Sequence, residues 1–536
     1  MEILYNARIY TLEDSQPIAS AIAIEHGRVV AAGETDELTS TFEGAEKRDM
    51  GGKIILPGLT DAHIHLEHYA LSLQKIDCET ETLDECLRRV EERVHSAKPG
   101  EWVLGHGWNQ NSWVPSPSGR GARGEGWPSA ADLDKIAPTT PVYLTAKSLH
   151  AAWANSAALK KAGLTANSPD PANGQLQRDA EGQLTGILLE TAMEQVGKAI
   201  PEPSMEAIAE AIEQAQLILL RMGLTGVHDF DRRNCFMALQ QLHSNSRLKL
   251  RVTKSIPLDD LEHAVGLGLR TGFGDDHLRI GSVKAFMDGA LGPRTAAMLQ
   301  PYLNEPENRG ILNMDAEELF EASRAAATVG LSMAVHAIGD RANHEVLDAY
   351  EQLRRFERDH DLPPLRHRIE HVQMIHPDDA GRLAELGIIA SMQPIHATSD
   401  MHMADQYWGE RAVLAYAWNT QLQNGAQLAF GSDAPVESPN PFWGLHATVT
   451  RQRADGSPGM DGWYPEQRLT MQQALQGYTS GAAYAAGMED RSGKLAPGYF
   501  ADLIVLAQDP FAIPPADVLE MESLSTMVGG EWVWQS

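Results

Sequence analysis

Residues 54–65 read Ile54-Ile55-Leu56-Pro57-Gly58-Leu59-Thr60-Asp61-Ala62-His63-Ile64-His65, an apolar run that is interrupted by Pro-Gly and ends in two histidines. Side chains on a strand alternate between its faces, so His63 and His65 point to the same side and can bind one metal ion. Two imidazoles at the end of an apolar strand indicate a catalytic metal whose other ligands come from elsewhere in the chain. Two surface histidines would give the same short motif, so the interpretation depends on the sequence downstream.

Eight segments along the chain share one pattern, a short apolar β run that ends in polar or ionisable residues. They are residues 54–65, 226–231, 248–256, 281–289, 332–340, 368–373, 388–394 and 428–435. Helix-like sequence lies between them, as in residues 208–222, where apolar side chains recur every three or four positions behind Ser204 as a candidate N-cap. This alternation predicts an α/β fold, a (β/α)8 TIM barrel whose active site lies at the C-terminal ends of the strands.

Both ends of the chain carry short β segments with glycine turns. They favour one small β-sandwich built from residues 1–56 and 490–536, the alternative being two unrelated β tails. The barrel would then occupy residues 57–489. Residues from about 75 to 203 form an insertion that is too long for an ordinary crossover, and we expect it to lie over the active site and build the substrate pocket.

The composition restricts the partners. Lysine and arginine number 44 against 73 acidic residues, so the formal charge is −29, and such a surface repels nucleic acid. Three cysteines, Cys78, Cys86 and Cys235, make neither a disulfide framework nor a Cys-x-x-Cys zinc motif. The sequence shows no signal-peptide pattern and no apolar run of transmembrane length. We therefore expect a cytoplasmic protein with no nucleic-acid or membrane partner.

Four further ionisable residues lie where predicted strands end. They are Lys284, His336, His371 and Asp433. Strand ends of a closed barrel converge, so these side chains can meet the two histidines of the first strand. Each has a simpler interpretation: a histidine can bond to a backbone carbonyl, and Asp433 can serve as a turn or N-cap residue. Lys284 must reach solvent, pair with an anion or be modified, because burying a bare charge is costly. Their joint occurrence at strand ends favours a metal centre.

Over nearly its whole length the sequence resembles the metal-dependent amidohydrolase superfamily. The motifs that carry the resemblance are residues 57–65, residues 223–229, Gly431-Ser432-Asp433 and residues 493–503. Residues 283–296, 335–342 and 432–436 are most similar to the branch that contains N-substituted formamide deformylases and YtcJ-like hydrolases. The resemblance implies a barrel enzyme that hydrolyses carbon–nitrogen bonds.

The resemblance also implies a binuclear centre of two zinc ions, with other divalent metals as alternatives. His63, His65 and Asp433 would hold one ion, and His336 and His371 the other. Lys284, carboxylated by CO2, would bridge them, which also removes the cost of a buried ammonium. The metals would activate a hydroxide that attacks the substrate carbonyl, and Asp433 would pass its proton to the leaving amine. In the rival arrangement a single metal is bound, Lys284 is unmodified and His371 contacts the substrate.

Five residues are candidates for substrate binding because their segments resemble the branch or lie near the centre. They are Trp108, His150, Glu190, Arg294 and His396. A structural role is an equal alternative for each; Trp108, for example, can be a core aromatic residue. The partner we expect is a small amide-type molecule, and a homodimer is the candidate assembly.

Three functional hypotheses follow. The leading one is a metal-dependent hydrolase that cleaves a linear amide, an N-formyl or N-acyl group. A second keeps the fold but changes the target to a cyclic amide, an amidine or an ester. A third is a binding or regulatory protein without turnover, and the complete ligand set argues against it. Specificity lies in loops, so the sequence leaves the substrate open.

Overall fold

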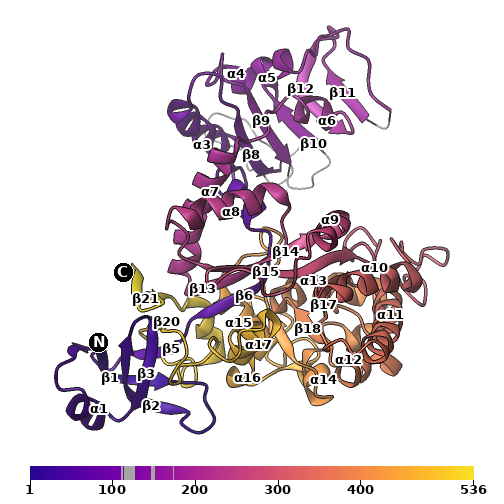
Figure 1. Ribbon diagram of the computed structural model, residues 1–536. Coiled ribbons are helices and arrows are strands. Elements are labelled where there is room, and N and C mark those ends of the chain that lie inside the picture. The colour runs from indigo at the N-terminus through magenta and orange to yellow at the C-terminus, as the bar shows by residue number, and fades with distance from the viewer. Residues whose placement is uncertain (110–112, 114–126, 147–150, 173) are drawn as a thin grey trace. The chain divides into compact units, whose positions relative to one another are not determined.

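The computed structural model describes residues 1–109, 113, 127–146, 151–172 and 174–536 (Figure 1). The chain folds into two compact units. Unit 1 comprises Met1–Tyr69 and Ile208–Ser536, and unit 2 comprises Ala70–Ala207. The boundaries given above for the barrel and the sandwich, and the position of the insertion over the active site, stay predictions.

Eight parallel strands of unit 1 form the barrel sheet. In spatial order they are β6 (Leu59–Ile64), β13 (Leu224–Asp229), β14 (Arg251–Pro257), β15 (Leu278–Phe286), β16 (Met333–Ala337), β17 (Arg368–His371), β18 (Ile389–Met392) and β19 (Leu428–Phe430). Neighbours pair in parallel, and their order in space equals their order in sequence. Each of the eight segments that we singled out overlaps one barrel strand, so the predicted (β/α)8 fold is confirmed.

The barrel closes at a seam between its first and last strands. The amide of Asp433 donates to the carbonyl of His63 at 2.7 Å, and the amide of His65 donates to the carbonyl of Ala434 at 2.9 Å. Glycine is required at position 431, because a Cβ there would lie 2.4 Å from the backbone nitrogen of His63. The seam therefore places Asp433 directly against the His-x-His motif.

Helices follow the strands and pack on the outside of the barrel sheet. Those in contact with the strands are α8 (Arg233–Ser244), α9 (Leu261–Gly266), α11 (Asp340–Asp359), α12 (Arg382–Leu386), α14 (Trp418–Gln423), α16 (Met471–Tyr478) and α17 (Ser480–Ala486). The predicted helix over residues 208–222 is present as α7 (Met205–Arg221), and the hydroxyl of Ser204 accepts the amide of Ala207 at 3.2 Å as an N-cap. Among the described helices none is long and apolar enough to cross a membrane.

Strands from both ends of the chain share one mixed sheet (Figure 1). Its order is β22 (Glu531–Gln535), β21 (Ser523–Val528), β20 (Leu503–Leu506), β5 (Ile54–Pro57), β1 (Glu2–Tyr10), β2 (Ile18–Glu25) and β3 (Arg28–Gly33), with β4 (Glu46–Asp49) beside β1. The predicted union of the two termini in one β structure is thus confirmed. The first apolar run is split at Gly58: β5 belongs to this sheet and β6 to the barrel.

Unit 2 contains a second sheet, with six strands. Its order is β11 (Gly174–Arg178), β12 (Leu184–Glu190), β10 (Ala151–Ala154), β9 (Val142–Ala146), β8 (Val103–Trp108) and β7 (Ile76–Asp77). Helix α3 (Leu83–Ser96) packs on β8, and its buried side chains share one hydrophobic core with Trp108, Trp113 and Trp153. All three cysteines are free and buried.

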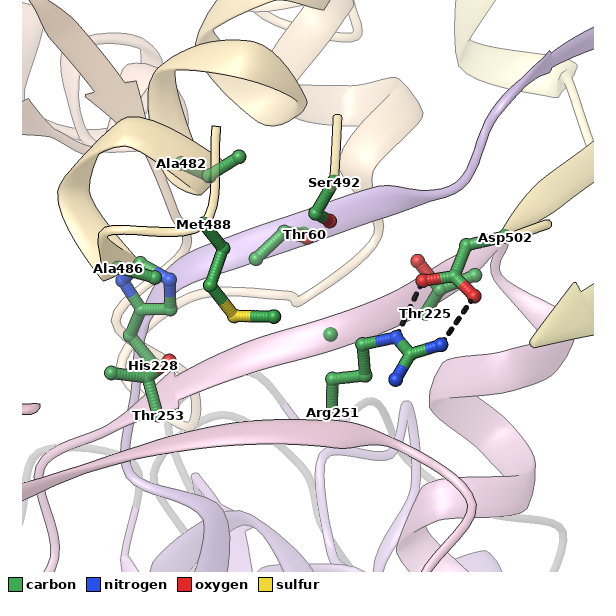
Figure 2. Close-up of a pocket in the computed structure, with 12 residues that line it drawn as sticks. Thr60, Thr225, His228, Arg251, Thr253, Ala482, Ala486, Met488, Ser492 and Asp502 are labelled. Carbon is green, nitrogen blue, oxygen red and sulfur yellow. Dashed lines mark hydrogen bonds and ion pairs between the residues drawn. The ribbon is translucent and has the colours of Figure 1, made fainter. Parts of the chain in front are cut away.

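A buried ion pair joins the barrel to the terminal sheet beside the small cavity of Figure 2. Arg251 of β14 donates to both carboxylate oxygens of Asp502, at 2.6 and 2.9 Å. Asp502 directly precedes β20, and its Oδ1 also accepts the amide of Gly529 at 2.7 Å. The cavity, which Thr60 and His228 also line, measures about 20 Å³ and has room for about one water.

Arg251→Met should destabilise the fold strongly. The variant keeps an aliphatic side chain but leaves the Asp502 carboxylate buried without its counter-ion, and breaking a buried pair in this way costs about 3–5 kcal/mol. Urea titration should show a loss of that size in the free energy of unfolding. Arg247→Met is the matched control, because it breaks only the more exposed pair with Glu213 and should cost at most about 1 kcal/mol. Equal, small losses in the two variants would contradict this role of Arg251.

Candidate metal centre

The six predicted ligands come together at the C-terminal ends of the barrel strands. They are His63 and His65 at the end of β6, Lys284 on β15, His336 on β16, His371 closing β17, and Asp433 just after β19. The ring centroids of His63 and His371 lie 5.0 Å apart, and those of His336 and His371 lie 4.5 Å apart. Four of the six are buried, while His65 and His336 are half-buried. Residues far apart in sequence thus form one cluster.

Asp433 lies at the middle of this cluster. Its Oδ1 is 3.4 Å from His63 Nε2 and 3.5 Å from His65 Nε2, and its Oδ2 is 3.7 Å from His396 Nε2. Among the described residues, two sets of donor atoms that include Asp433 lie close enough to hold a metal ion, each set within 4.8 Å: His63, His65 and Asp433, and His371, His396 and Asp433. One carboxylate is therefore shared by two groups of histidines.

Several buried nitrogens of the cluster have no hydrogen-bond partner within the described residues. They are His63 Nε2, Lys284 Nζ, His371 Nδ1 and His396 Nε2. Buried polar atoms are rarely left unpaired, so their convergence needs an explanation. Burial lowers the pKa of both His63 and His371, and the neutral imidazole is the form that binds a metal. Imidazoles with a carboxylate form a donor set that suits zinc, so the residues fit the implied metal centre.

Two buried lysines on neighbouring strands differ sharply. Lys254 of β14 pairs with the Asp229 carboxylate at 2.9 Å and donates to the backbone carbonyls of Asp231 and Ser255. Despite its burial, that carboxylate keeps the pKa of Lys254 above its ordinary value. Lys284 has no such partner among the described residues: its Nζ lies 4.4 Å from the centroid of the Phe230 ring and 5.0 Å from that of Phe286, and burial lowers its pKa to about 8. Among the described residues, Lys284 thus neither reaches solvent nor pairs with an anion.

His336 combines the two interpretations that we left open. Its Nε2 lies 2.9 Å from the carbonyl oxygen of Gly289, which can only accept, so Nε2 carries the hydrogen. The structure thus contains the bond to a backbone carbonyl that we considered as the simpler interpretation of this histidine. It leaves Nδ1 as the nitrogen with a free lone pair, and burial lowers the pKa of His336 to about 3, so the ring stays neutral. A structural bond and a ligand role are compatible in this residue.

Two carboxylates that the motifs did not single out hold the histidines of β6. Glu370 Oε2 lies 2.6 Å from His63 Nδ1, and Asp231 Oδ1 lies 3.0 Å from His65 Nδ1. A carboxylate that accepts from Nδ1 keeps the hydrogen there and leaves Nε2 bare toward Asp433. Both carboxylates were visible in the sequence as ionisable residues at strand ends. What the sequence did not show was which histidine each one faces.

A model of the amidohydrolase family matches residues 46–534 of the chain. The chain belongs to this family. Its relatives include the protein LONG AFTER FAR-RED 3 of Arabidopsis thaliana, 34% identical over 99% of this chain and 91% of the relative. The putative amidohydrolase YtcJ of Bacillus subtilis is 31% identical, with 99% of each chain covered. The N-substituted formamide deformylase of Arthrobacter pascens is 28% identical over 98% of this chain and 97% of the relative. The predicted branch is thus confirmed.

A solved structure of an uncharacterized metal-dependent hydrolase from Pyrococcus horikoshii superposes on the chain with a TM-score of 0.78. The two sequences are 30% identical, and the match covers 96% of this chain and 99% of the other. The family and this structural likeness identify the chain as a metal-dependent hydrolase of the amidohydrolase superfamily.

In this amidohydrolase the two carboxylates that hold the histidines have different surroundings. Glu370 forms an ion pair with the buried Arg368, which donates to both of its carboxylate oxygens. Asp231 has a second histidine instead: His68 Nδ1 lies 2.5 Å from the same oxygen that faces His65. Burial opposes ionisation of Asp231, but the hydrogen bonds from His65 and His68 outweigh it and hold its pKa below the ordinary value. Asp231 therefore stays an anionic acceptor for the two histidines.

Asp231→Asn should weaken metal binding by about 10–100-fold, the usual effect of losing the partner of a ligating histidine. The amide is a poorer acceptor and can present its NH2 to His65 Nδ1, which favours the wrong tautomer. Competition with a chelator measures the affinity. His68→Ala is the matched control, because it removes the other histidine from the same oxygen and leaves the contact with His65 in place. Equal losses of metal affinity in the two variants would contradict the role of Asp231 as the partner that orients His65.

Backbone conformation explains how this amidohydrolase directs neighbouring residues to one centre. Strict alternation on β17 would send Glu370 and His371 to opposite faces. His371 and Val372 have φ values of 78° and 45°, which turn the chain at the strand end so that both side chains reach the cluster. Asp433 has a φ of 62°. Residues other than glycine seldom adopt this left-handed region, and such strain clusters at functional sites.

The candidates for substrate binding are distributed unevenly. His396 lies beside Asp433, as described above. Arg294 belongs to the same unit and pairs with Glu305. Trp108 is buried in the core of unit 2, where its indole donates to the carbonyl of Leu144 at 2.9 Å, and Glu190 is an exposed residue at the end of β12. His150 lies outside the described residues. Within unit 1, His396 is thus the candidate that joins the predicted ligands.

Proposed function

We propose that this amidohydrolase cleaves a linear amide, an N-formyl or N-acyl compound, into a carboxylic acid and an amine. The observation that carries the proposal is the position of Asp433, between the bare Nε2 atoms of the β6 histidines and the unpaired Nε2 of His396. Such a carboxylate can move a proton next to a polarised carbonyl. A relative that matches 98% of this chain and is named an N-substituted formamide deformylase supports the substrate class.

We further propose that the centre holds two zinc ions. His63, His65 and Asp433 would bind one and His336 and His371 the other, with Lys284 as a carbamate between them. The evidence for this set is the unpaired His63 Nε2 and His371 Nδ1, the neutral imidazoles of these two residues and the unpartnered Lys284. Ions bound there would activate water and polarise the carbonyl group of the substrate.

The proton transfers belong to Asp433. As the water oxygen attacks the carbonyl carbon, the Asp433 carboxylate accepts one proton of that water. The carboxyl group then donates it to the amide nitrogen while the carbon–nitrogen bond breaks, so amide and water become acid and amine. Glu370 and Asp231 keep the histidines of β6 in one tautomer throughout, because each holds the hydrogen on Nδ1.

A substrate panel tests the proposed function. The full chain, loaded with zinc, is incubated with N-formyl amines, N-acyl amines, cyclic amides and esters of matched size, and the release of amine or alcohol is measured. We expect turnover of the linear amides to exceed that of the cyclic amides and esters. Metal-stripped protein is the control and should be inactive. Turnover confined to cyclic amides or esters would overturn the proposal, as would equal activity without metal.

A further inference from the structure

His396 has two differently bonded ring nitrogens. It lies in the first turn of α13 (Pro394–Trp408) and is 7% exposed. Its Nδ1 is 3.2 Å from the amide nitrogen of Gln373. Its Nε2 has no hydrogen-bond partner within the described part of the chain and lies 3.7 Å from Asp433 Oδ2. One nitrogen is therefore held by the protein, and the other is directed at the reacting carboxylate.

The bond from Gln373 fixes the tautomer. An amide NH2 group can only donate, so His396 Nδ1 accepts and a neutral ring carries its hydrogen on Nε2. This is the opposite of the β6 histidines, where carboxylates on Nδ1 leave Nε2 bare for a metal. His396 thus presents an N–H group toward Asp433, whereas His63 and His65 present lone pairs.

Gln373 is well placed for this task. It follows β17, is 2% exposed, and its backbone carbonyl accepts the amide of Tyr416 at 2.7 Å. Its Oε1 has no partner among the described residues. Within that part of the chain, the side chain of Gln373 therefore makes its hydrogen bond to His396. A buried glutamine that meets one histidine in this way defines the orientation of that histidine.

We propose that the Nε2–H group of His396 donates a hydrogen bond to the carbonyl oxygen of the amide substrate, and that Gln373 is the positioning residue that keeps the hydrogen on Nε2. The inference rests on the proposed function. When the water oxygen attacks, the π electrons of the carbonyl group move onto its oxygen, and the Nε2–H group stabilises that negative charge. The proton lost by the water goes to Asp433, whose Oδ2 lies 3.7 Å from His396 Nε2, and then to the amine. Donor and base thus act on the same carbon atom.

Substitutions at His396 test the donor. His396→Met removes the N–H group and should lower kcat by about 10², the scale for one oxyanion donor, with little change in KM. His396→Gln places an amide NH2 near the position of Nε2, so this variant should keep most of the kcat that His396→Met loses. The inference is overturned if an amide is turned over and His396→Met keeps its kcat, or if the methionine and glutamine variants lose the same amount. Absence of turnover in the wild type would instead overturn the proposed function.

Substitutions at Gln373 separate positioning from packing. Gln373→Met keeps the volume and frees the tautomer, so kcat should fall with KM unchanged. Gln393→Met is the matched control: Gln393 is also 2% exposed and close in sequence to His396, but its amide donates to the carbonyl of Ser391. A loss in Gln393→Met equal to that in Gln373→Met would overturn the positioning role.

The tautomer is measurable without turnover. In metal-free, ¹⁵N-histidine-labelled protein, the His396 signals are identified by their loss in His396→Gln. We expect Nε2 to carry the hydrogen in the wild type, and both tautomers to be populated in Gln373→Met. A wild-type ring with its hydrogen on Nδ1 would overturn the inference whatever the kinetics show.

Discussion

Asp433→Asn is expected to lower kcat by at least about two orders of magnitude while the fold persists. Asparagine can neither accept the proton of the attacking water nor return one to the amine. It does tolerate the left-handed backbone conformation at this position, where φ is 62°, so the seam should keep its shape. Loss of activity would then reflect the proton transfer and not the fold.

Three measurements are needed to interpret that variant. Steady-state kinetics on the best substrate of the panel give kcat, circular dichroism checks the fold, and elemental analysis gives the metal content, because Asp433 is also a proposed ligand. The role assigned to Asp433 is refuted if a folded, metal-loaded Asp433→Asn protein turns over at a near-normal rate.

Lys284→Ala is expected to lose both bound metal and activity. The reason is the unusual state of this lysine, which is buried near histidines and contacts no anionic partner in the part of the chain that the structure describes. Only a neutral amine reacts with CO2, and burial favours that form by lowering the pKa of Lys284 to about 8. The resulting carbamate would supply two anionic oxygens to the ions. Acetate or propionate added to the variant should partly restore metal binding and turnover.

The modification itself can be detected apart from activity. Protein equilibrated with ¹³CO2 and zinc should show one carbamate carbon signal that is absent in Lys284→Ala. Lys254 serves as an internal comparison, because its ion pair with Asp229 keeps it charged and unreactive. An unmodified Lys284 beside a single well-occupied metal would refute the bridging role and support the rival one-metal site.

The clustering of the six candidate residues could be predicted from sequence because each of them lies at the end of an apolar run. Barrel topology brings strand ends together, so the position of His336 or Asp433 within its segment was enough to predict their meeting. The same rule underlies the correct prediction of all eight barrel strands. It depends only on local pattern and on the order of the strands.

Pairing between side chains could not be predicted in this way. Glu370 and Asp231 were both visible at strand ends, but which histidine each would face depends on barrel register and on the turn at His371. No sequence pattern indicated a role for Gln373, because a single glutamine after a strand belongs to no recognisable motif. Its meeting with His396 requires the packing of α13 over the end of β17. The division of the first apolar run at Gly58 likewise depends on tertiary pairing.

The seam of the barrel determines when the proposed metal centre can be completed during protein synthesis. The amide of Ser432 bonds to the carboxylate of Asp61 across 371 residues of sequence. At about 5–20 residues per second, a ribosome needs roughly 20–75 s to make that length. Until then β6 remains an open edge strand, and Asp433 has not joined the histidines. A metal centre that includes Asp433 can therefore be completed only after translation of the last barrel strand, and until then the open edge of β6 is a site for edge-to-edge aggregation.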